Sequence, residues 1–274
     1  MRTGLAGGIV RKRFRGRENI SKYRFFRACR KCDLQNRLFL RMRLILLLLC
    51  IPAAVAGQTV TGLPVSKYGL PVANDPSVYN RLVRQDASNR LLDLRELIPD
   101  AMFDVTYAGV NNFLGRKIYP TADVFLRKPA AEALVRVAER LRAKGLGLLL
   151  FDGYRPYSVT VLFYEEIGDT TFVADPRKGS KHNRGMAIDL SLFDLKTGKP
   201  LEMPSKYDEA SERAWHSWSG GEPGALANRE ILKESMVSEG FEVFKYEWWH
   251  YDYRGWQSCV TYDLWHSTIR KANR

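Results

Sequence analysis

The chain has 274 residues, of which 45% are hydrophobic and 27% charged, a composition typical of a soluble globular protein. Its formal net charge of +13 comes almost entirely from residues 1–43, which carry 14 Lys and Arg residues against only Glu18 and Asp33. The remaining chain is close to neutral. This distribution argues against a basic domain built to bind nucleic acid, so no nucleic-acid partner is expected.

The first predicted element is an export signal. The basic flank Arg41-Met42-Arg43 precedes an apolar run of 13 residues that ends in the small-residue triplet Ala54-Val55-Ala56, the pattern of a cleaved signal peptide. The run is shorter than the roughly 20 residues of a membrane-spanning helix. We therefore expect residues 1–57 to be a basic leader and signal peptide, and the protein to be exported, periplasmic or secreted. Membrane contact is expected only if this segment stays uncleaved.

The leader leaves its start residue open, and its cysteines decide whether a lipid anchor or a disulfide is expected. Met42 would also serve as a start, so the origin of residues 1–41 stays open. A lipid anchor on Cys50 is disfavoured because Leu49 precedes it where a small residue is expected. Cleavage would leave Cys259 as the single cysteine, which excludes an intramolecular disulfide in the mature protein.

The rest of the chain is predicted to be an extended lead-in followed by one α+β domain. Residues 58–90 mix Pro, Gly and small polar residues with little periodicity and are assigned to the lead-in, and residues 91–274 to the domain. Apolar periodicity predicts helices over 129–143, 157–167 and 225–238, strands over 146–151, 186–193 and 241–253, and a hairpin turn at 196–199. Several connections are too short for parallel crossovers, so we expect an antiparallel-rich central sheet flanked by helices.

Two histidines stand in carboxylate-rich contexts beside predicted strands. His182 lies in a loop before Gly185, with Asp189 on the following strand, and His250 follows Glu247 in an aromatic strand. A catalytic zinc ion takes three protein ligands and leaves one position for water, and a carboxylate that does not bind the metal accepts the proton of that water. Residues i and i+3 point to opposite faces of a regular strand. Glu247 and His250 can therefore meet at one site only if the strand breaks between them.

The flanking residues make this pattern specific. Ser180-x-His182-x-x-Gly185-x-Ala187-x-Asp189, followed by Glu247-x-Trp249-His250, resembles the zinc D-Ala-D-Ala peptidases of the hedgehog fold. The turn at 152–156 (Asp-Gly-Tyr-Arg-Pro) and the two tryptophans before His250 are similar to the D-alanyl-D-alanine dipeptidase (VanX-type) branch. The resemblance extends from about Leu91 to Tyr253, so it implies this fold for most of the mature chain.

The resemblance also implies a role for each site residue. His182, Asp189 and His250 would bind one zinc ion per chain, Glu247 would be the catalytic base, and Arg155 would stabilise the charge that develops on the scissile carbonyl. Ser180 would contact the substrate, and Asp208 would receive its ammonium group. Structural alternatives stay open for three of them: a salt bridge for Arg155, a loop cap for Ser180 and a helix cap for Asp208. Trp248 and Trp249 are expected in the core and pocket wall, and His216 and His266 as surface or core residues.

The resemblance implies hydrolysis of a small D-amino-acid dipeptide, D-Ala-D-Ala, in cell-wall metabolism. One alternative is a D,D- or L,D-carboxypeptidase or endopeptidase that acts on longer peptidoglycan peptides with the same chemistry. Another is a zinc-stabilised wall-binding protein without catalysis, which the joint presence of Glu247 and Arg155 disfavours. The sequence leaves the oligomeric state open.

Overall fold

The computed structural model describes residues 62–170 and 172–274. The predicted leader and signal peptide, and the first residues of the lead-in, lie outside the described residues. Within the described ranges, no helix combines the length and the apolar character that crossing a membrane requires.

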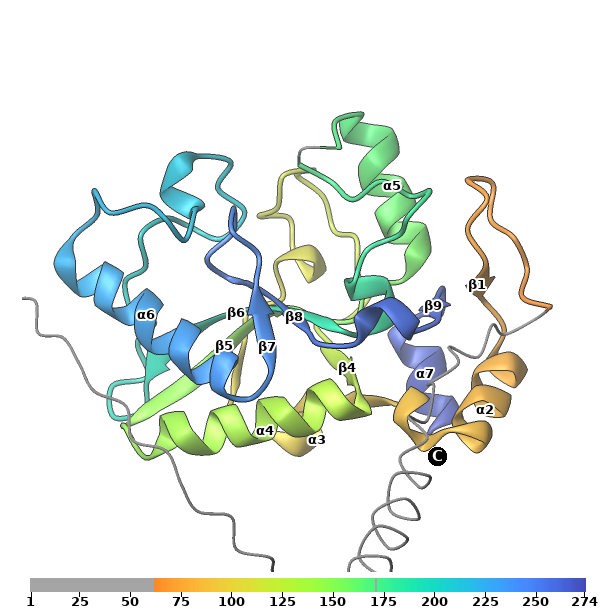
Figure 1. Cartoon of the computed structure of the whole chain (residues 1–274), viewed down its shortest axis with the longest axis horizontal. Coiled ribbons are helices and arrows are strands. Elements are labelled where there is room, and N and C mark those ends of the chain that lie inside the picture. Colours follow the sequence, from red (N-terminus) through yellow and green to blue (C-terminus); the bar gives the residue numbers. More distant parts are fainter. Residues whose placement is uncertain (1–61, 171) are drawn as a thin grey trace, which may run out of the picture. The chain divides into compact units, whose positions relative to one another are not determined.

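The described residues form helices interspersed with short strands (Figure 1). The helices are α2 (Pro76–Gln85), α3 (Leu94–Leu97), α4 (Lys128–Arg142), α5 (Tyr157–Ile167), α6 (Pro223–Ser238) and α7 (His266–Ala272). The strands are β1 (Val72–Ala73), β2 (Leu91–Asp93), β3 (Met102–Phe103), β4 (Phe125–Arg127), β5 (Leu146–Asp152), β6 (Ala187–Asp194), β7 (Phe241–Val243), β8 (His250–Tyr253) and β9 (Thr261–Tyr262). Short 3-10 turns join them: η1 (Ala87–Asn89), η2 (Thr106–Ala108), η3 (His182–Arg184), η4 (Glu212–Ala214) and η5 (Trp256–Ser258).

The central sheet has the strand order β3-β5-β6-β8-β7. Only β3 and β5 pair in parallel, and the other three pairings are antiparallel. Helix α4 packs against β5 and against α6, which covers β6 and β7 (Figure 1). The α+β class and the antiparallel-rich sheet flanked by helices are therefore confirmed, as are the helices predicted near 129–143, 157–167 and 225–238.

Helix α4 shows how the sequence specifies the core. Pro129 stands in its first turn, where a missing amide hydrogen costs nothing. Leu134, Val137 and Leu141 recur at helical spacing, and all three are fully buried. Gly145 follows the helix with a φ of +75°, a left-handed conformation that glycine adopts without steric cost, and the chain then enters β5.

The lead-in differs from the prediction because it contains helix α2. Asp75 caps this helix by accepting hydrogen bonds from the amides of Ser77 and Val78, and Pro76 opens the first turn. Tyr79 and Leu82, three residues apart, are buried. The segment was predicted to be extended because it has few hydrophobic residues with little periodicity. The sequence nevertheless contains the capping signal of a short helix, Asp75 followed by Pro76.

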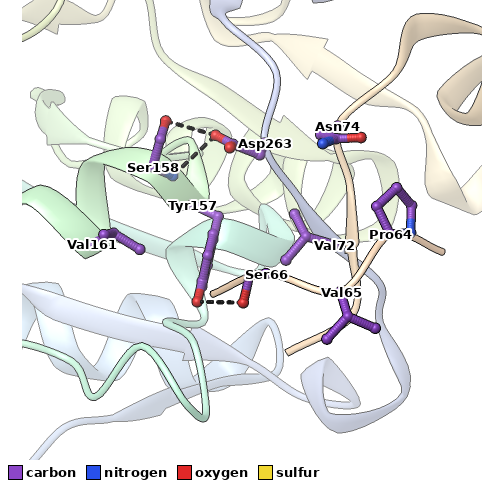
Figure 2. Close-up of a pocket in the computed structure, with 9 residues that line it drawn as sticks. All are labelled: Pro64, Val65, Ser66, Val72, Asn74, Tyr157, Ser158, Val161 and Asp263. Carbon is purple, nitrogen blue, oxygen red and sulfur yellow. Dashed lines mark hydrogen bonds between the residues drawn. The ribbon is translucent and has the colours of Figure 1, made fainter. Parts of the chain in front are cut away.

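The segment before α2 packs beside α5 and the end of β9. Strand β1 pairs in parallel with β9, and the Tyr157 hydroxyl lies 3.0 Å from the Ser66 hydroxyl. Asp263 accepts hydrogen bonds from the amide and the hydroxyl of Ser158 at the start of α5. These groups border a pocket of about 220 Å³, whose lining residues Figure 2 shows: Pro64, Val65, Ser66, Val72, Asn74, Tyr157, Ser158, Val161 and Asp263.

The predicted strand over 241–253 is a hairpin in the structure. Strand β7 ends at Val243, a turn follows, and β8 begins at His250 and pairs with both β7 and β6. Aromatic residues, which favour strands, fill the turn without a Gly or Pro signal, so the sequence did not show that residues 244–249 leave the strand. The break required between Glu247 and His250 is confirmed.

Candidate metal centre

Three polar residues lie in one row across neighbouring strands of the central sheet. Asp152 of β5 is opposite Asp189 of β6, and Asp189 is opposite His250 of β8. A β-bulge between Leu150 and Asp152 sets the first of these pairings. Directly opposite residues share a face of the sheet, so the three side chains project to the same side. Each is at least nine-tenths buried, so any charge they carry needs a partner.

His182 reaches this row from a turn rather than from a strand. It lies in η3, which is capped by Gly185 with a φ of +64°. A Cβ atom on Gly185 would lie 2.4 Å from Leu91 Cδ2 and 2.9 Å from the Arg127 backbone nitrogen, so only glycine fits there without displacement. The Arg127 amide also donates to the Gly185 carbonyl oxygen, which fixes the turn against β4.

The structure brings His182, Asp189 and His250 together as one group of donors. His250 Nδ1 lies 2.9 Å from Asp189 Oδ1 and 3.2 Å from His182 Nε2, and His182 Nε2 lies 3.4 Å from Asp189 Oδ1. A tetrahedral ion with bonds of about 2.0–2.1 Å separates its ligand atoms by roughly 3.3 Å. Two imidazoles and one carboxylate at these separations fit a divalent transition metal, and the three residues could hold one.

Each of these three side chains has its other polar atom bonded to the protein. His182 Nδ1 lies 2.7 Å from the Gly153 carbonyl oxygen and His250 Nε2 lies 2.9 Å from Asp252 Oδ1, while Asp189 Oδ2 accepts a hydrogen bond of 3.1 Å from the Tyr207 hydroxyl. Such contacts fix ring orientation and tautomer, and they leave His182 Nε2, His250 Nδ1 and Asp189 Oδ1 to face one point.

None of these three outer partners was predicted from the sequence. Asp252 could have been found, since it follows His250 by two residues on the same strand and therefore shares its face. Tyr207 precedes a predicted site residue but carried no signal of its own, and the Gly153 carbonyl is a backbone group that side-chain motifs do not reveal.

Glu247 lies in the turn between β7 and β8, beside the donor group but outside it. Its Oε2 atom is 3.8 Å from His250 Nδ1, and its side chain keeps 33% of its exposure, whereas that of Asp189 keeps 4%. Burial raises the pKa of Glu247, and the charge of Asp189 acts in the same direction. A partly exposed carboxylate of raised pKa next to a metal site is placed to exchange protons with a bound water molecule.

Arg155 is paired with a strand carboxylate. Its Nε and Nη2 atoms donate to Asp152 Oδ2 at 2.9 and 2.7 Å, and the Tyr119 hydroxyl donates to Asp152 Oδ1. The structural salt bridge considered from the sequence is therefore present. Burial raises the pKa of Glu247 and of Asp208, and the charge of Arg155 partly offsets this, so the guanidinium lies within electrostatic reach of both carboxylates.

Asp208 is partly buried in the same region and is not a helix cap. The nearest following turn, η4, begins after Ser211, so the helix-cap alternative is wrong. Asp208 has a φ of +59°, and it is the one non-glycine residue of the described ranges with a positive φ. The Tyr107 hydroxyl donates to its Oδ2 at 2.8 Å. Burial, followed by the charge of Asp189, raises the pKa of Asp208 to about 7.

Ser180 caps the turn that carries His182. Its hydroxyl accepts a hydrogen bond from the His182 amide at 3.2 Å, as the loop-cap alternative expects. His216 and His266 lie outside the donor group. Trp248 and Trp249 are buried in the core, and Trp249 packs edge-on against Tyr207. No residue that lines the pocket of Figure 2 belongs to the donor group.

Comparison with known proteins places this chain among the metallopeptidases. The peptidase M15 family model, described as D-Ala-D-Ala dipeptidase, matches residues 87–269. The chain belongs to this family. It is 34% identical to the D-alanyl-D-alanine dipeptidase of Escherichia coli over 60% of this chain and 85% of that protein. It is 33% identical to the D-alanyl-D-alanine dipeptidase of Enterococcus faecium over 58% of this chain and 88% of that one.

A solved structure of the LdcB LD-carboxypeptidase, described with its peptidoglycan recognition, also matches. It is 21% identical, covers 67% of this chain and 72% of its own, and has a TM-score of 0.37.

Proposed function

We propose that this chain is a zinc-dependent dipeptidase that hydrolyses D-alanyl-D-alanine in cell-wall metabolism. The observation that carries the proposal is the convergence of His182, Asp189 and His250 within 3.4 Å of one another, with the Glu247 carboxylate beside them, in a member of the D-Ala-D-Ala dipeptidase family. Both relatives compared above are D-alanyl-D-alanine dipeptidases. The basic and apolar leader supports export to the periplasm or the exterior.

A bound zinc ion would supply Lewis acidity that activates water and polarises the peptide carbonyl. Glu247 accepts the proton of the attacking water as the new carbon–oxygen bond forms, and it delivers a proton to the nitrogen as the carbon–nitrogen bond breaks. Burial raises the pKa of Glu247, which favours its acceptance of the water proton. Hydrolysis of D-Ala-D-Ala releases two D-alanine molecules.

The charged residues around Glu247 orient the substrate. Arg155 donates hydrogen bonds to the carbonyl oxygen as negative charge develops there, with its guanidinium fixed by Asp152. Asp208 receives the substrate ammonium, whose positive charge favours the ionised carboxylate that burial otherwise disfavours. A free amino terminus is therefore part of what the site recognises.

The test compares D-Ala-D-Ala, its N-acetyl derivative and muropeptides that end in D-Ala-D-Ala, each with and without a chelator. We expect D-Ala-D-Ala to be hydrolysed, the N-acetyl derivative to be poor, and the chelator to abolish turnover until zinc is restored. Preferential hydrolysis of the blocked or longer peptides would instead assign the chain to the D,D- or L,D-carboxypeptidases or endopeptidases. Chelator-resistant hydrolysis would contradict the metal assignment.

A further inference from the structure

Asp252 lies directly behind one of the two histidines in the donor group. It follows His250 by two residues on β8, so both side chains project from the same face of the strand. Asp252 Oδ1 is 2.9 Å from His250 Nε2, the ring nitrogen that faces away from Asp189 and His182. Asp252 is buried, with 6% of its surface exposed, so this contact is protected from water.

Lys181 holds the second oxygen of the same carboxylate. Its Nζ atom is 2.8 Å from Asp252 Oδ2, and it lies 5.4 Å from the ring centroid of Phe244 and 5.3 Å from that of Trp256. A cation placed between two aromatic rings is restrained by cation–π attraction. Because Lys181 directly precedes His182, one ion pair connects the two segments that carry the histidines.

The two histidines therefore have different partners. The ring nitrogen of His182 that faces away from the group meets the neutral carbonyl of Gly153, whereas that of His250 meets an anion. A carboxylate fixes the tautomer and ring orientation as a carbonyl does, and in addition it stabilises the positive charge that metal binding induces on the imidazole. His250 should thus be the stronger of the two imidazole donors.

We propose that Asp252, held in place by Lys181, is a positioning residue that keeps the Nε2 proton on His250, aims Nδ1 at the metal and strengthens metal binding. This inference rests on the metal centre of the proposed function. It gives His250 an anionic partner, Asp252, that is not among the predicted ligand, catalytic or substrate-binding residues.

The test measures zinc affinity by competition with a chromophoric chelator in the full chain. Asp252→Ala removes acceptor and charge, and we expect about 10- to 100-fold weaker zinc binding. Asp252→Asn keeps an oxygen that can accept from Nε2 but removes the charge, so a smaller loss is expected. Lys181→Met leaves the carboxylate in place, so its effect should be smaller than that of Asp252→Ala.

The matched control is Glu242→Gln. Glu242 is opposite Asp252 on β7, but it is exposed, so its loss of charge should leave zinc affinity unchanged. The unfolding midpoint of the metal-stripped protein is measured for every variant. A purely structural ion pair would lower that midpoint and leave the zinc affinity of the folded protein unaltered.

Unchanged zinc affinity in both Asp252→Ala and Asp252→Asn would overturn the inference and leave the proposed function intact. If Asp252→Ala does not fold, Asp252→Asn decides alone. Failure of the wild-type protein to bind zinc would instead overturn the metal centre itself, and with it the proposed function.

Discussion

The candidate site has two halves that the chain builds in different ways. Asp152, Asp189 and His250 stand in one row across three paired strands, so the register of the sheet sets their spacing. His182, Asp208 and Glu247 come from turns, and contacts with distant segments hold them. The Trp248 amide, for example, donates to the Ala214 carbonyl oxygen, and the His216 amide donates to that of Lys245, which fixes both sides of Glu247.

The strands give their side chains rigid placement. The turns carry the third metal donor, His182, together with Glu247 and Asp208, the groups proposed to exchange protons and meet the substrate. A strand residue buried on both sides has little freedom to move, whereas Glu247 keeps a third of its side-chain exposure. A base that carries a proton from water to a leaving nitrogen needs that access. Changes in the turns should therefore alter activity and local stability, and changes behind the strand row should alter metal affinity.

The largest effect is expected when the turn half loses its base. Glu247→Gln keeps the size of the side chain but cannot accept a proton, so we expect kcat for D-Ala-D-Ala to fall by about 10²–10⁴-fold. Bound zinc should stay at one per chain, because the three ligands are intact. Rates come from D-alanine release and zinc from metal analysis, with Glu242→Gln as the control. A zinc-loaded Glu247→Gln enzyme of normal activity would refute the base assignment.

The next effect concerns the glycine that shapes the His182 turn. Gly185→Ala places a Cβ atom against Leu91 and Arg127 in a left-handed conformation, so we expect the free energy of unfolding to fall by about 2–4 kcal/mol. Gly198→Ala is the matched control, since Gly198 has a φ of +67° but no atom within 4 Å of the added Cβ. It should cost only about 1–2 kcal/mol. Equal losses in urea unfolding would show that the close approach at Gly185 is unimportant.

Acidification should weaken the support of the Glu247 turn. Burial, with the nearby charges of Arg229 and Lys233 only partly offset by Glu230, lowers the pKa of His216 to about 4. Because the unfolded chain binds a proton on this residue below about pH 6.5, the stability that neutral His216 contributes is fully present above pH 6.5 and decreases as the pH falls towards 4. The loss should be on the order of 2–3 kcal/mol.

His216→Gln tests this pH dependence. Urea unfolding at pH 7 and pH 4.5, with a chelator present to keep metal binding out of the comparison, should show a smaller loss of stability on acidification for the variant than for the wild type. Carboxylates that titrate in both proteins cancel in this difference. Identical losses would mean that His216 does not couple to folding.

The strands that carry one half of the site were largely predictable from apolar patterns in the sequence. The residues of the turn half were predicted only from their resemblance to a family motif. The buried strand at 146–152, the strand that carries Asp189 and the α4 helix follow from apolar runs and periodicity that the structure confirms. The hairpin between Val243 and His250 did not follow, because hydrogen bonds from the 214–216 segment hold its turn and local preference does not. The positive φ of Asp208 and the donation from Tyr207 to Asp189 likewise depend on tertiary contacts.

The smallest effect is expected where the two halves touch. Tyr207 lies in the Asp208 turn and donates to Asp189 Oδ2, while its ring stacks on Phe151 at 4.5 Å. Tyr207→Phe removes the hydroxyl and keeps the ring packing, so Asp189 loses one orienting hydrogen bond. We expect zinc binding to weaken by roughly 3- to 10-fold with little change in unfolding midpoint.

Tyr107→Phe makes the matched change one carboxylate away. It removes the hydroxyl that donates to Asp208. This hydrogen bond opposes the rise that burial causes in the pKa of Asp208. Asp208 should then be protonated more often at neutral pH, so KM for D-Ala-D-Ala should rise while zinc affinity stays the same. Because each hydroxyl serves a different carboxylate, the two variants should separate metal affinity from substrate affinity. If both variants changed zinc binding equally, the turn and strand halves would be one coupled unit and the distinction between them would fail.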